Sequence, residues 1–224
     1  MDWIEKAVAC PVLKGVDPQR LREVFAEVQF QIKKYNQEDA IAHQGDEVNC
    51  LMILLKGSVR GEMTDYSGRM IKIEDIQAPK PIAGAFLFGR QNIYPVDITA
   101  NESSVILKIF RDQFLKLLQL CPSVQLNYLN HISTKAHFLS TKIKFLSFKT
   151  LKGKIAHYIL QLDGDEDGFF LLPQTQQEMA DLFGAARPSV ARAFGQMEAE
   201  GVLEMTNRKV KVLSRNNLLA YFEE

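Results

Sequence analysis

The sequence has no net charge, few cysteines and no long apolar run. Its 27 basic and 27 acidic residues cancel, so the overall charge argues neither for nor against a nucleic-acid partner. The three cysteines, Cys10, Cys50 and Cys121, are odd in number and far apart, which disfavours a disulfide framework. No apolar run approaches a membrane-spanning length, and the N-terminus lacks the basic and apolar regions of a signal peptide. We therefore expect a cytoplasmic protein that is not inserted in a membrane.

The sequence also lacks the side-chain patterns of catalysis and of metal binding. It has no nucleophile with a neighbouring base at a recognisable spacing, and no set of metal ligands. Residues 163–168, DGDEDG, match the first half of a calcium-binding loop, but the twelfth position is Gln174 and not a bidentate glutamate. We therefore expect an acidic surface turn there, no metal site and no enzyme activity. Four histidines are present and none stands in a motif: His43, His131, His137 and His157.

The chain has an ordinary globular composition, and the pattern of its apolar residues divides it into three segments. Apolar residues make up 46% of it, and 224 residues suffice for two modest domains. From residue 30 to about 109, short apolar segments alternate with turn residues, which suggests a sandwich or jelly roll. The predicted strands are 30–32, 40–42, 50–55, 58–62, 70–76, 96–100 and 105–109. We divide the chain into domains 1–121, 122–149 and 150–224.

A long helix is predicted from Pro122 to about residue 147. Its apolar residues recur at spacings of three and four, the heptad pattern of a coiled-coil seam, over about two and a half repeats. Two interpretations stay open, a seam between two copies of the chain or one helix packed on its own β domain. The seam residues are Leu129, Ile132, Ala136, Leu139, Ile143 and Leu146.

The stretch 175–201 predicts two short helices around a tight turn. Thr175 and Glu178 form a Thr-x-x-Glu capping box that starts the first helix, and Gly184 ends it. Pro188 is tolerated in the first turn of the second helix because its missing N–H would be unpaired there. Two such helices have the shape of a helix-turn-helix, whose second helix enters the DNA major groove.

The residues on and after the second helix strengthen this interpretation over that of a generic helical hairpin. Arg187, Ser189 and Arg192 avoid its apolar face and are free to reach bases. Segments 202–204 and 209–213 read as two strands joined by a tight turn, which would form a wing. The sequence therefore predicts a winged helix-turn-helix.

This C-terminal segment closely resembles the DNA-binding domain of the CRP/FNR family of bacterial regulators. The N-terminal half resembles the family's cyclic-nucleotide-binding β-roll through Gln44-Gly45-Asp46 and the stretch CLMILLKGSV that contains Gly57. The implied fold is α+β, with a jelly-roll effector domain, a long dimerisation helix and a winged helix-turn-helix. The residues that carry the C-terminal match are Thr175, Glu178, Ala180, Leu182, Gly184, Arg187, Ser189, Val190, Arg192, Glu198 and Gly201.

The resemblance implies a homodimer that places two recognition helices in successive major grooves, roughly 34 Å apart, on a pseudo-palindromic operator of double-stranded DNA. Arg187 and Arg192 match the family's guanine-reading arginines. Where this chain has Pro188, the family usually has a glutamate, whose carboxylate accepts a hydrogen bond from cytosine. Proline cannot do so, and we expect selection at that base pair to be lost. RNA polymerase is the expected protein partner. The expected phosphate contacts are Ser189, Thr175, Gln176, Arg208 and Lys209.

The residues that bind cyclic AMP in the family are not present here. Ala85 follows Gly84 where the ribose-binding glutamate should stand, and 94–96 read Tyr-Pro-Val in place of Arg-Ser-Ala. Arg90 is four residues away from the phosphate-binding position. Because a buried phosphate needs a charged partner, we expect that neither cyclic AMP nor cyclic GMP binds.

The remaining candidate effector pocket is largely apolar. Either it holds an apolar small molecule or a haem, with one histidine as axial ligand, or its own side chains fill it and no cofactor binds. One cysteine near the N-terminus cannot hold an iron–sulfur cluster. The pocket residues are Gly84, Ala85, Phe86, Phe88, Tyr94, Val96, Leu139 and Ser140.

We therefore expect a dimeric, sequence-specific DNA-binding transcription regulator, either constitutive or controlled by an effector other than cyclic AMP. The alternative is a ligand-binding or interaction module with a vestigial DNA-binding domain. Two features favour the alternative. From residue 150 onward eight basic residues face eleven acidic ones, and Ala186 stands where a Ser or Thr cap is usual.

Overall fold

The computed structural model describes residues 3–64, 69–162 and 169–221. Contacts divide the chain into two compact units, Met1–Lys135 and Ala136–Glu224. Each unit has a hydrophobic core of its own. The acidic turn predicted at 163–168 lies outside the described residues.

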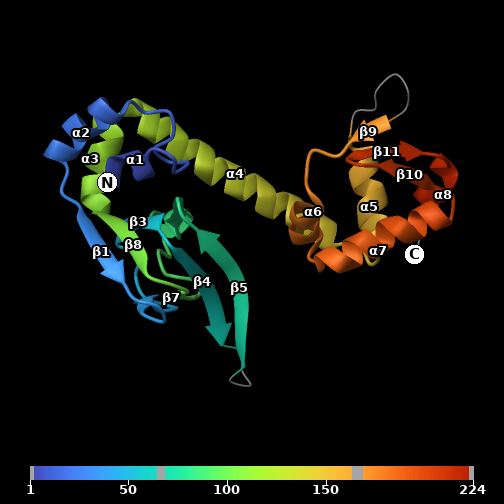
Figure 1. Cartoon of the computed structure of the whole chain (residues 1–224), viewed down its shortest axis with the longest axis horizontal. Coiled ribbons are helices and arrows are strands. Elements are labelled where there is room, and N and C mark those ends of the chain that lie inside the picture. Colours follow the sequence, from blue (N-terminus) through green and yellow to red (C-terminus); the bar gives the residue numbers. More distant parts are fainter. Residues whose placement is uncertain (1–2, 65–68, 163–168, 222–224) are drawn as a thin grey trace. The chain divides into compact units, whose positions relative to one another are not determined.

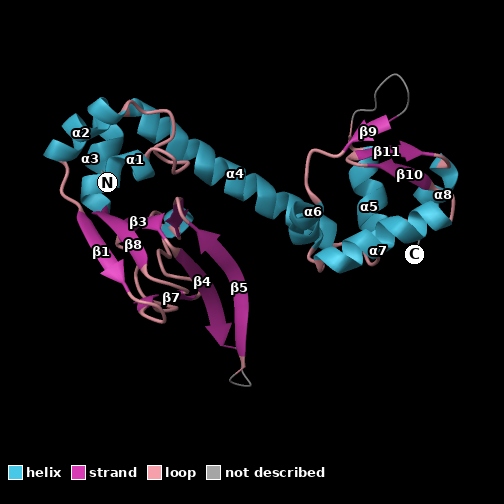
Figure 2. Ribbon diagram, viewed as in Figure 1, coloured by secondary structure: helices cyan, strands magenta, loops and turns pink. Residues whose placement is uncertain are grey.

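The first unit contains two four-stranded antiparallel sheets, which confirm the predicted jelly-roll domain (Figure 2). Their strand orders are β1-β8-β3-β6 and β2-β7-β4-β5. Both sheets contribute to one core, and β3 is buried over its first six residues, as a central strand with two covered faces should be. The strands are β1 Gln31–Tyr35, β2 Ala40–Ala42, β3 Cys50–Lys56, β4 Ser58–Thr64, β5 Met70–Gln77, β6 Lys80–Ile82, β7 Asp97–Ala100 and β8 Ser104–Phe110.

Helices of the first unit pack on these sheets and contribute to the same core. Asp17 caps α2, because its carboxylate accepts the Gln19 amide at 2.6 Å and leaves fewer unpaired donors in the first turn. The helices are α1 Trp3–Ala7, α2 Pro18–Glu27, the 3₁₀ turn η1 Gly84–Phe86, α3 Arg111–Leu120 and the long α4 Pro122–Leu146.

The second unit combines helices with a three-stranded antiparallel sheet of order β10-β11-β9 (Figure 1). Its core gathers the apolar faces of α5, α6 and α7 and includes Phe183, Phe194 and Met197. Thr150 caps α5, with its hydroxyl accepting the Gly153 amide at 3.0 Å. The elements are α5 Leu151–Leu160, β9 Phe169–Leu171, α6 Gln176–Phe183, α7 Arg187–Ala199, β10 Leu203–Thr206, β11 Lys209–Val212 and α8 Arg215–Ala220.

The long helix α4 contributes to both cores. Near its start, Val124 and Tyr128 are buried in the first unit, and Ile132 is partly buried against that core. Near its end, Phe145 is 1% exposed in the core of the second unit, where its ring lies 5.0 Å from that of Phe183. Contacts therefore divide the chain at 135/136, inside the helix, whereas the sequence analysis starts the DNA-binding domain at residue 150.

The strands of the first unit differ most from the predicted ones in two places. The first strand occupies Gln31–Tyr35 and not 30–32, since Phe30 packs with Trp3 and Phe25 in an aromatic cluster before the strand begins. Strand β6 was not predicted, because three residues that include a proline carry almost no pattern.

Candidate nucleic-acid interface and effector site

The pair α6 and α7 has the predicted helix-turn-helix geometry. The Thr175 hydroxyl accepts the Glu178 amide at 3.2 Å, and the Glu178 carboxylate accepts the Thr175 amide at 2.7 Å, which completes the capping box. Gly184 ends α6 with φ of 66°, in the left-handed region that favours glycine. A Cβ at Gly184 would lie 2.9 Å from Leu146 Cδ2, so the turn also requires glycine for space.

Helix α7 buries one face and exposes the other. Its buried residues, Val190, Ala193, Phe194 and Met197, recur at helical spacing and belong to the core of the second unit. Arg187 and Arg192 are exposed, and neither forms a hydrogen bond or ion pair with any described residue. Both guanidinium groups are therefore available to a partner outside the chain.

The start of α7 has no side-chain cap. Ala186 has no side chain that could cap the helix, and Pro188 stands in the first turn. Ser189 is half-buried, and its amide donates to the Ala186 carbonyl at 2.9 Å. The N-terminus of the helix therefore adds partial positive charge beside Arg187.

The wing is present, and its two predicted basic residues differ in their surroundings. Strands β10 and β11 pair from Leu203↔Val212 to Thr206↔Lys209, with Asn207 at positive φ in the turn between them. The guanidinium of Arg208 donates to the Pro173 carbonyl, so this side chain is held by its own unit. The ammonium group of Lys209 lies 5.8 Å from the centre of the Phe169 ring.

The two predicted phosphate contacts at the start of α6 also differ. The hydroxyl of Thr175 donates to the Glu178 carboxylate at 2.9 Å, so it is committed to the capping box. Gln176 is half-buried as the first residue of α6. At this end of the helix, the backbone donors and the Gln176 amide are better suited to a phosphate than the threonine hydroxyl.

In the first unit, the predicted effector residues lie in and after a single 3₁₀ turn. Gly84 is buried, and its carbonyl accepts the Tyr128 hydroxyl at 2.9 Å. Phe88 stacks on Phe114 with ring centres 6.3 Å apart and meets the edge of Tyr128 at 6.0 Å. Phe88 is thus packed against α3 and α4, while Ala85 and Phe86 are exposed.

The two predicted pocket residues that follow pack into the β domain. Tyr94 is buried, and burial raises the pKa of its hydroxyl well above the ordinary value. Val96 is half-buried, with a methyl group 3.1 Å from the place where a Gly61 Cβ would lie. Leu139 and Ser140 belong to the second unit, where both are exposed on α4.

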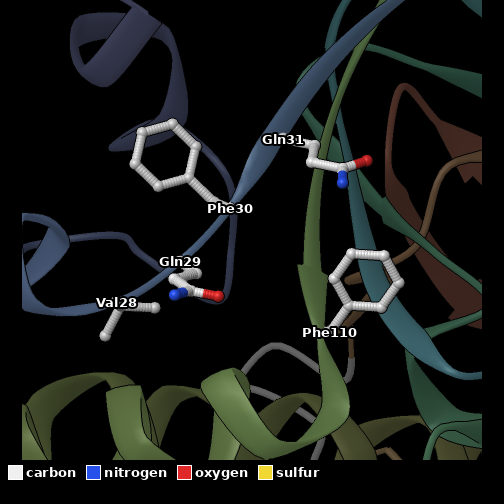
Figure 3. A pocket seen from close by; sticks show the side chains of 5 residues that line it. All are labelled: Val28, Gln29, Phe30, Gln31 and Phe110. Carbon is white, nitrogen blue, oxygen red and sulfur yellow. The ribbon is translucent and has the colours of Figure 1, made fainter.

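A pocket of about 380 Å³ opens elsewhere in the first unit, where the α2–β1 connection meets the end of β8 (Figure 3). Figure 3 shows Phe30 and Gln31 pointing to opposite sides of the chain. This pocket was not predicted from the sequence, because its residues come from two distant segments with no shared pattern. The lining residues are Val28, Gln29, Phe30, Gln31 and Phe110.

The histidines and cysteines are dispersed. Burial lowers the pKa of His131 and of His157, with a smaller effect of a nearby lysine in each case. All three cysteines are buried and unpaired, and burial raises the pKa of Cys10 to about 11. No group of three or more His, Cys, Asp or Glu side chains in the described ranges could hold a metal ion.

Two family models match the chain. A Crp-like helix-turn-helix domain matches residues 153–221, and a cyclic nucleotide-binding domain matches residues 32–121. Together they cover the β domain and the winged helix.

Curated relatives align along most of the chain. The "Cyclic AMP receptor protein" of Thermus thermophilus is 25% identical over 202 residues, which are 90% of this chain and 92% of the relative. The "cAMP-activated global transcriptional regulator CRP" of Salmonella typhimurium is 22% identical over 186 residues, 81% of this chain and 89% of the relative. The "Transcriptional activator protein FnrA" of Stutzerimonas stutzeri is 25% identical over 190 residues, 81% of this chain and 76% of the relative.

The fold has relatives among solved structures. The Thermus thermophilus catabolite activator protein matches with a TM-score of 0.55 and 22% identity, covering 95% of this chain and 98% of the other. A transcriptional regulator from Thermotoga maritima matches 58% of this chain and 98% of its own with a TM-score of 0.52 and 28% identity.

Among the helices in the described ranges, none is both long enough and apolar enough to cross a membrane. The two family models, the curated relatives and the two-domain fold agree with the resemblance found in the sequence. The relatives from Salmonella typhimurium and Stutzerimonas stutzeri are named as a transcriptional regulator and a transcriptional activator. The chain belongs to the CRP/FNR family of DNA-binding transcription regulators.

Proposed function

We propose that the protein is a homodimer that binds a pseudo-palindromic operator, reads guanines with Arg187 and Arg192, and does not respond to cyclic AMP. The observation that carries the proposal is the exposure of both arginines on α7, without a partner among the described residues. Arginine pairs with guanine O6 and N7 through two parallel hydrogen bonds, the commonest specific contact in the major groove.

The remaining contacts position the helix on the DNA backbone. Gln176 and the first amides of α6 bind one phosphate, and Ser189 binds another beside the start of α7. Lys209 reaches a phosphate from the wing, and Arg208 does so only if it leaves the Pro173 carbonyl. Thr175 does not bind phosphate itself; its capping box fixes the start of α6, whose amides make the phosphate contact.

Dimerisation uses the exposed apolar residues of α4. Leu139, Ile143 and Leu146 are 56%, 70% and 55% exposed, which is unusual for large apolar side chains on one helix. Leu129 is 54% exposed in the first unit, and Ala136 continues the pattern. A parallel pair of such helices buries these residues against each other.

By family resemblance, the protein partner is RNA polymerase, and the protein acts in the cytoplasm.

The absence of a cyclic-AMP response follows from the residues of the β domain. No carboxylate follows Gly84 and no arginine stands at 94–96, so a cyclic phosphate would be buried without a charge partner. The packing of Phe88 on Phe114 and Tyr128 supports the interpretation that side chains fill the former pocket. Haem or an apolar molecule remains the alternative effector.

The proposal is tested by selecting operator DNA from a random-sequence pool with the purified full-length chain. Parallel selections contain no ligand, cyclic AMP or haem. We expect the ligand-free selection to enrich a palindrome with guanine in each half-site, and cyclic AMP to leave the enrichment unchanged. The R187A/R192A double variant is the control and should enrich nothing. Enrichment that requires cyclic AMP would refute the proposed effector independence, and no enrichment in any arm would favour a vestigial DNA-binding domain.

A further inference from the structure

The first half of α7 exposes hydrogen-bond donors and apolar surface, and the exposed acceptors of the helix, Gln196 and Glu198, lie in its second half. Its first six residues, RPSVAR, carry two guanidinium groups, which only donate, and one half-buried hydroxyl at Ser189. The first carboxylate on the helix belongs to Glu198, whose Oε1 accepts the Met205 amide at 2.9 Å. The base-reading end of α7 therefore has no side chain that could accept a hydrogen bond from cytosine N4 as a carboxylate would.

The apolar part of this face is formed by Pro188 and Ala191. The residues three, four and seven positions after Pro188 are Ala191, Arg192 and Gly195. At this spacing the four residues share one face of the helix. This face lies opposite the buried Val190 and its neighbours. All four residues are exposed, and a Cβ at Gly195 would meet nothing within 4 Å. Because Pro188, Ala191 and Gly195 are small, this face of the helix can lie deep in the major groove.

The thymine methyl group is the apolar feature of the major groove that such a surface fits. It projects into the groove from C5, beside the O4 acceptor, and alanine and other small apolar groups contact it. Adenine and cytosine instead present an amino group there, which would face either a guanidinium donor or an apolar surface and lose its hydrogen bond to water.

Given the DNA-binding function proposed above, on which this inference rests, we propose that α7 selects keto bases. Guanines on the contacted strand pair with Arg187 and Arg192, and a thymine between them places its methyl group against Pro188 and Ala191. The sequence alone predicts that selection is lost where the family's glutamate is replaced by Pro188. The exposed apolar face of α7 indicates that a different base pair is selected at this position. The family's glutamate selects a pair through its cytosine, and Pro188 and Ala191 select one through the methyl group of thymine.

Modified DNA tests this directly, without any change to the protein. In the selected operator, each thymine of a half-site is replaced in turn by deoxyuridine, which removes only the methyl group. Binding is measured by fluorescence anisotropy at one salt concentration. We expect a loss of about fourfold at one or two adjacent positions, the value of one buried methyl group, and no change elsewhere.

Protein variants identify the side chains that contact the methyl group. The A191G variant should bind the thymine operator less than fourfold more tightly than the deoxyuridine operator, because only the Pro188 contact with the methyl group is left. The A199G variant is the matched control, because Ala199 is an exposed alanine at the other end of the same helix. It should keep the fourfold difference. In a new random-pool selection, P188E should enrich cytosine-containing pairs at the position where the wild type enriches thymine.

The outcomes separate this inference from the function on which it rests. If an operator is selected but deoxyuridine equals thymine at every position, keto-base selection is wrong while DNA binding stands. The same conclusion follows if adenine or cytosine is enriched between the guanines of the contacted strand. If the wild type selects no operator in any condition, both the DNA-binding proposal and the keto-base inference are refuted.

Discussion

Arg187 and Arg192 stand on the exposed face of α7 and contact no polar group in the described part of the chain. Binding DNA therefore breaks no hydrogen bond between either guanidinium group and a described residue. Arg208 differs, because its guanidinium already donates to the Pro173 carbonyl. At the residue scale, the two arginines of α7 are the side chains best prepared for specific contact.

Replacing either arginine of α7 by alanine should cost about 1–3 kcal/mol of specific affinity, since each removes a bidentate contact to guanine. Affinity for scrambled DNA should fall much less. Anisotropy titrations with both DNAs measure the two effects. R215A is the control, because Arg215 is an exposed arginine on α8, outside the recognition helix. An equal loss on both DNAs would mean that the arginine binds phosphate and reads no base.

The capping box gives a prediction of pH dependence at Glu178. Hydrogen bonds from the Thr175 amide and hydroxyl lower the pKa of the Glu178 carboxyl below its ordinary value. Folding therefore favours the ionised form. Its stabilising contribution is complete above the ordinary pKa, about 4.3, and is lost as the pH falls through the lower folded value.

The difference in melting temperature between the wild type and E178Q should be constant from neutral pH to about pH 5, and should shrink at lower pH. Differential scanning calorimetry across this range measures it. The E204Q variant is the control, because Glu204 is exposed on β10 and its carboxylate accepts no hydrogen bond from a described residue. A difference that grows with falling pH would contradict the role of the ionised carboxylate.

At the element scale, α4 is the segment where the sequence analysis and the structure differ most. The heptad spacing predicted the helix well, but it did not reveal that Phe145 joins the core of the second unit. That contact depends on Phe183 and Tyr158, which come from α6 and α5. Periodicity within one helix cannot identify such partners. Caps and glycine turns were predicted at single residues, because their physical cause lies within a few neighbouring positions.

Phe145 should therefore matter to the DNA-binding unit although it lies outside the predicted domain 150–224. The F145A variant should destabilise the second unit by about 3–5 kcal/mol, the usual cost of removing a fully buried aromatic ring. Hydrogen exchange of the α6 and α7 amides in the full chain measures this. Phe138 is the matched control, since it lies two turns earlier on α4 and is 37% exposed. An equal effect of F138A would contradict the assignment.

The exposed apolar residues of α4 give a second prediction at this scale. Ile143 is 70% exposed, so I143E should leave the monomer folded but prevent dimer formation, because two carboxylates would meet in the seam. Sedimentation velocity measures the change in mass. K144E alters the charge of the adjacent exposed residue and should remain dimeric. If the wild type is a monomer at micromolar concentration, the helix serves another purpose.

For the whole molecule, the sequence was sufficient for the order of domains and for the face of α7, and insufficient for the effector. The recognition helix could be predicted because a cap, a glycine and an apolar face fix which residues are exposed. The effector region could not be predicted, because whether it is open or filled depends on packing between distant segments. The contact of Phe88 with Phe114 and Tyr128 is an example. The pocket in Figure 3 was missed for the same reason.

The most direct test of the whole account is the ratio of the dissociation constants for scrambled DNA and for the selected operator. It is measured with the purified chain at one salt concentration and without any effector. We expect a ratio of at least about 10³, in the range of specific regulators. A ratio near one would show that the protein binds DNA only through its phosphates, and would contradict base reading by α7.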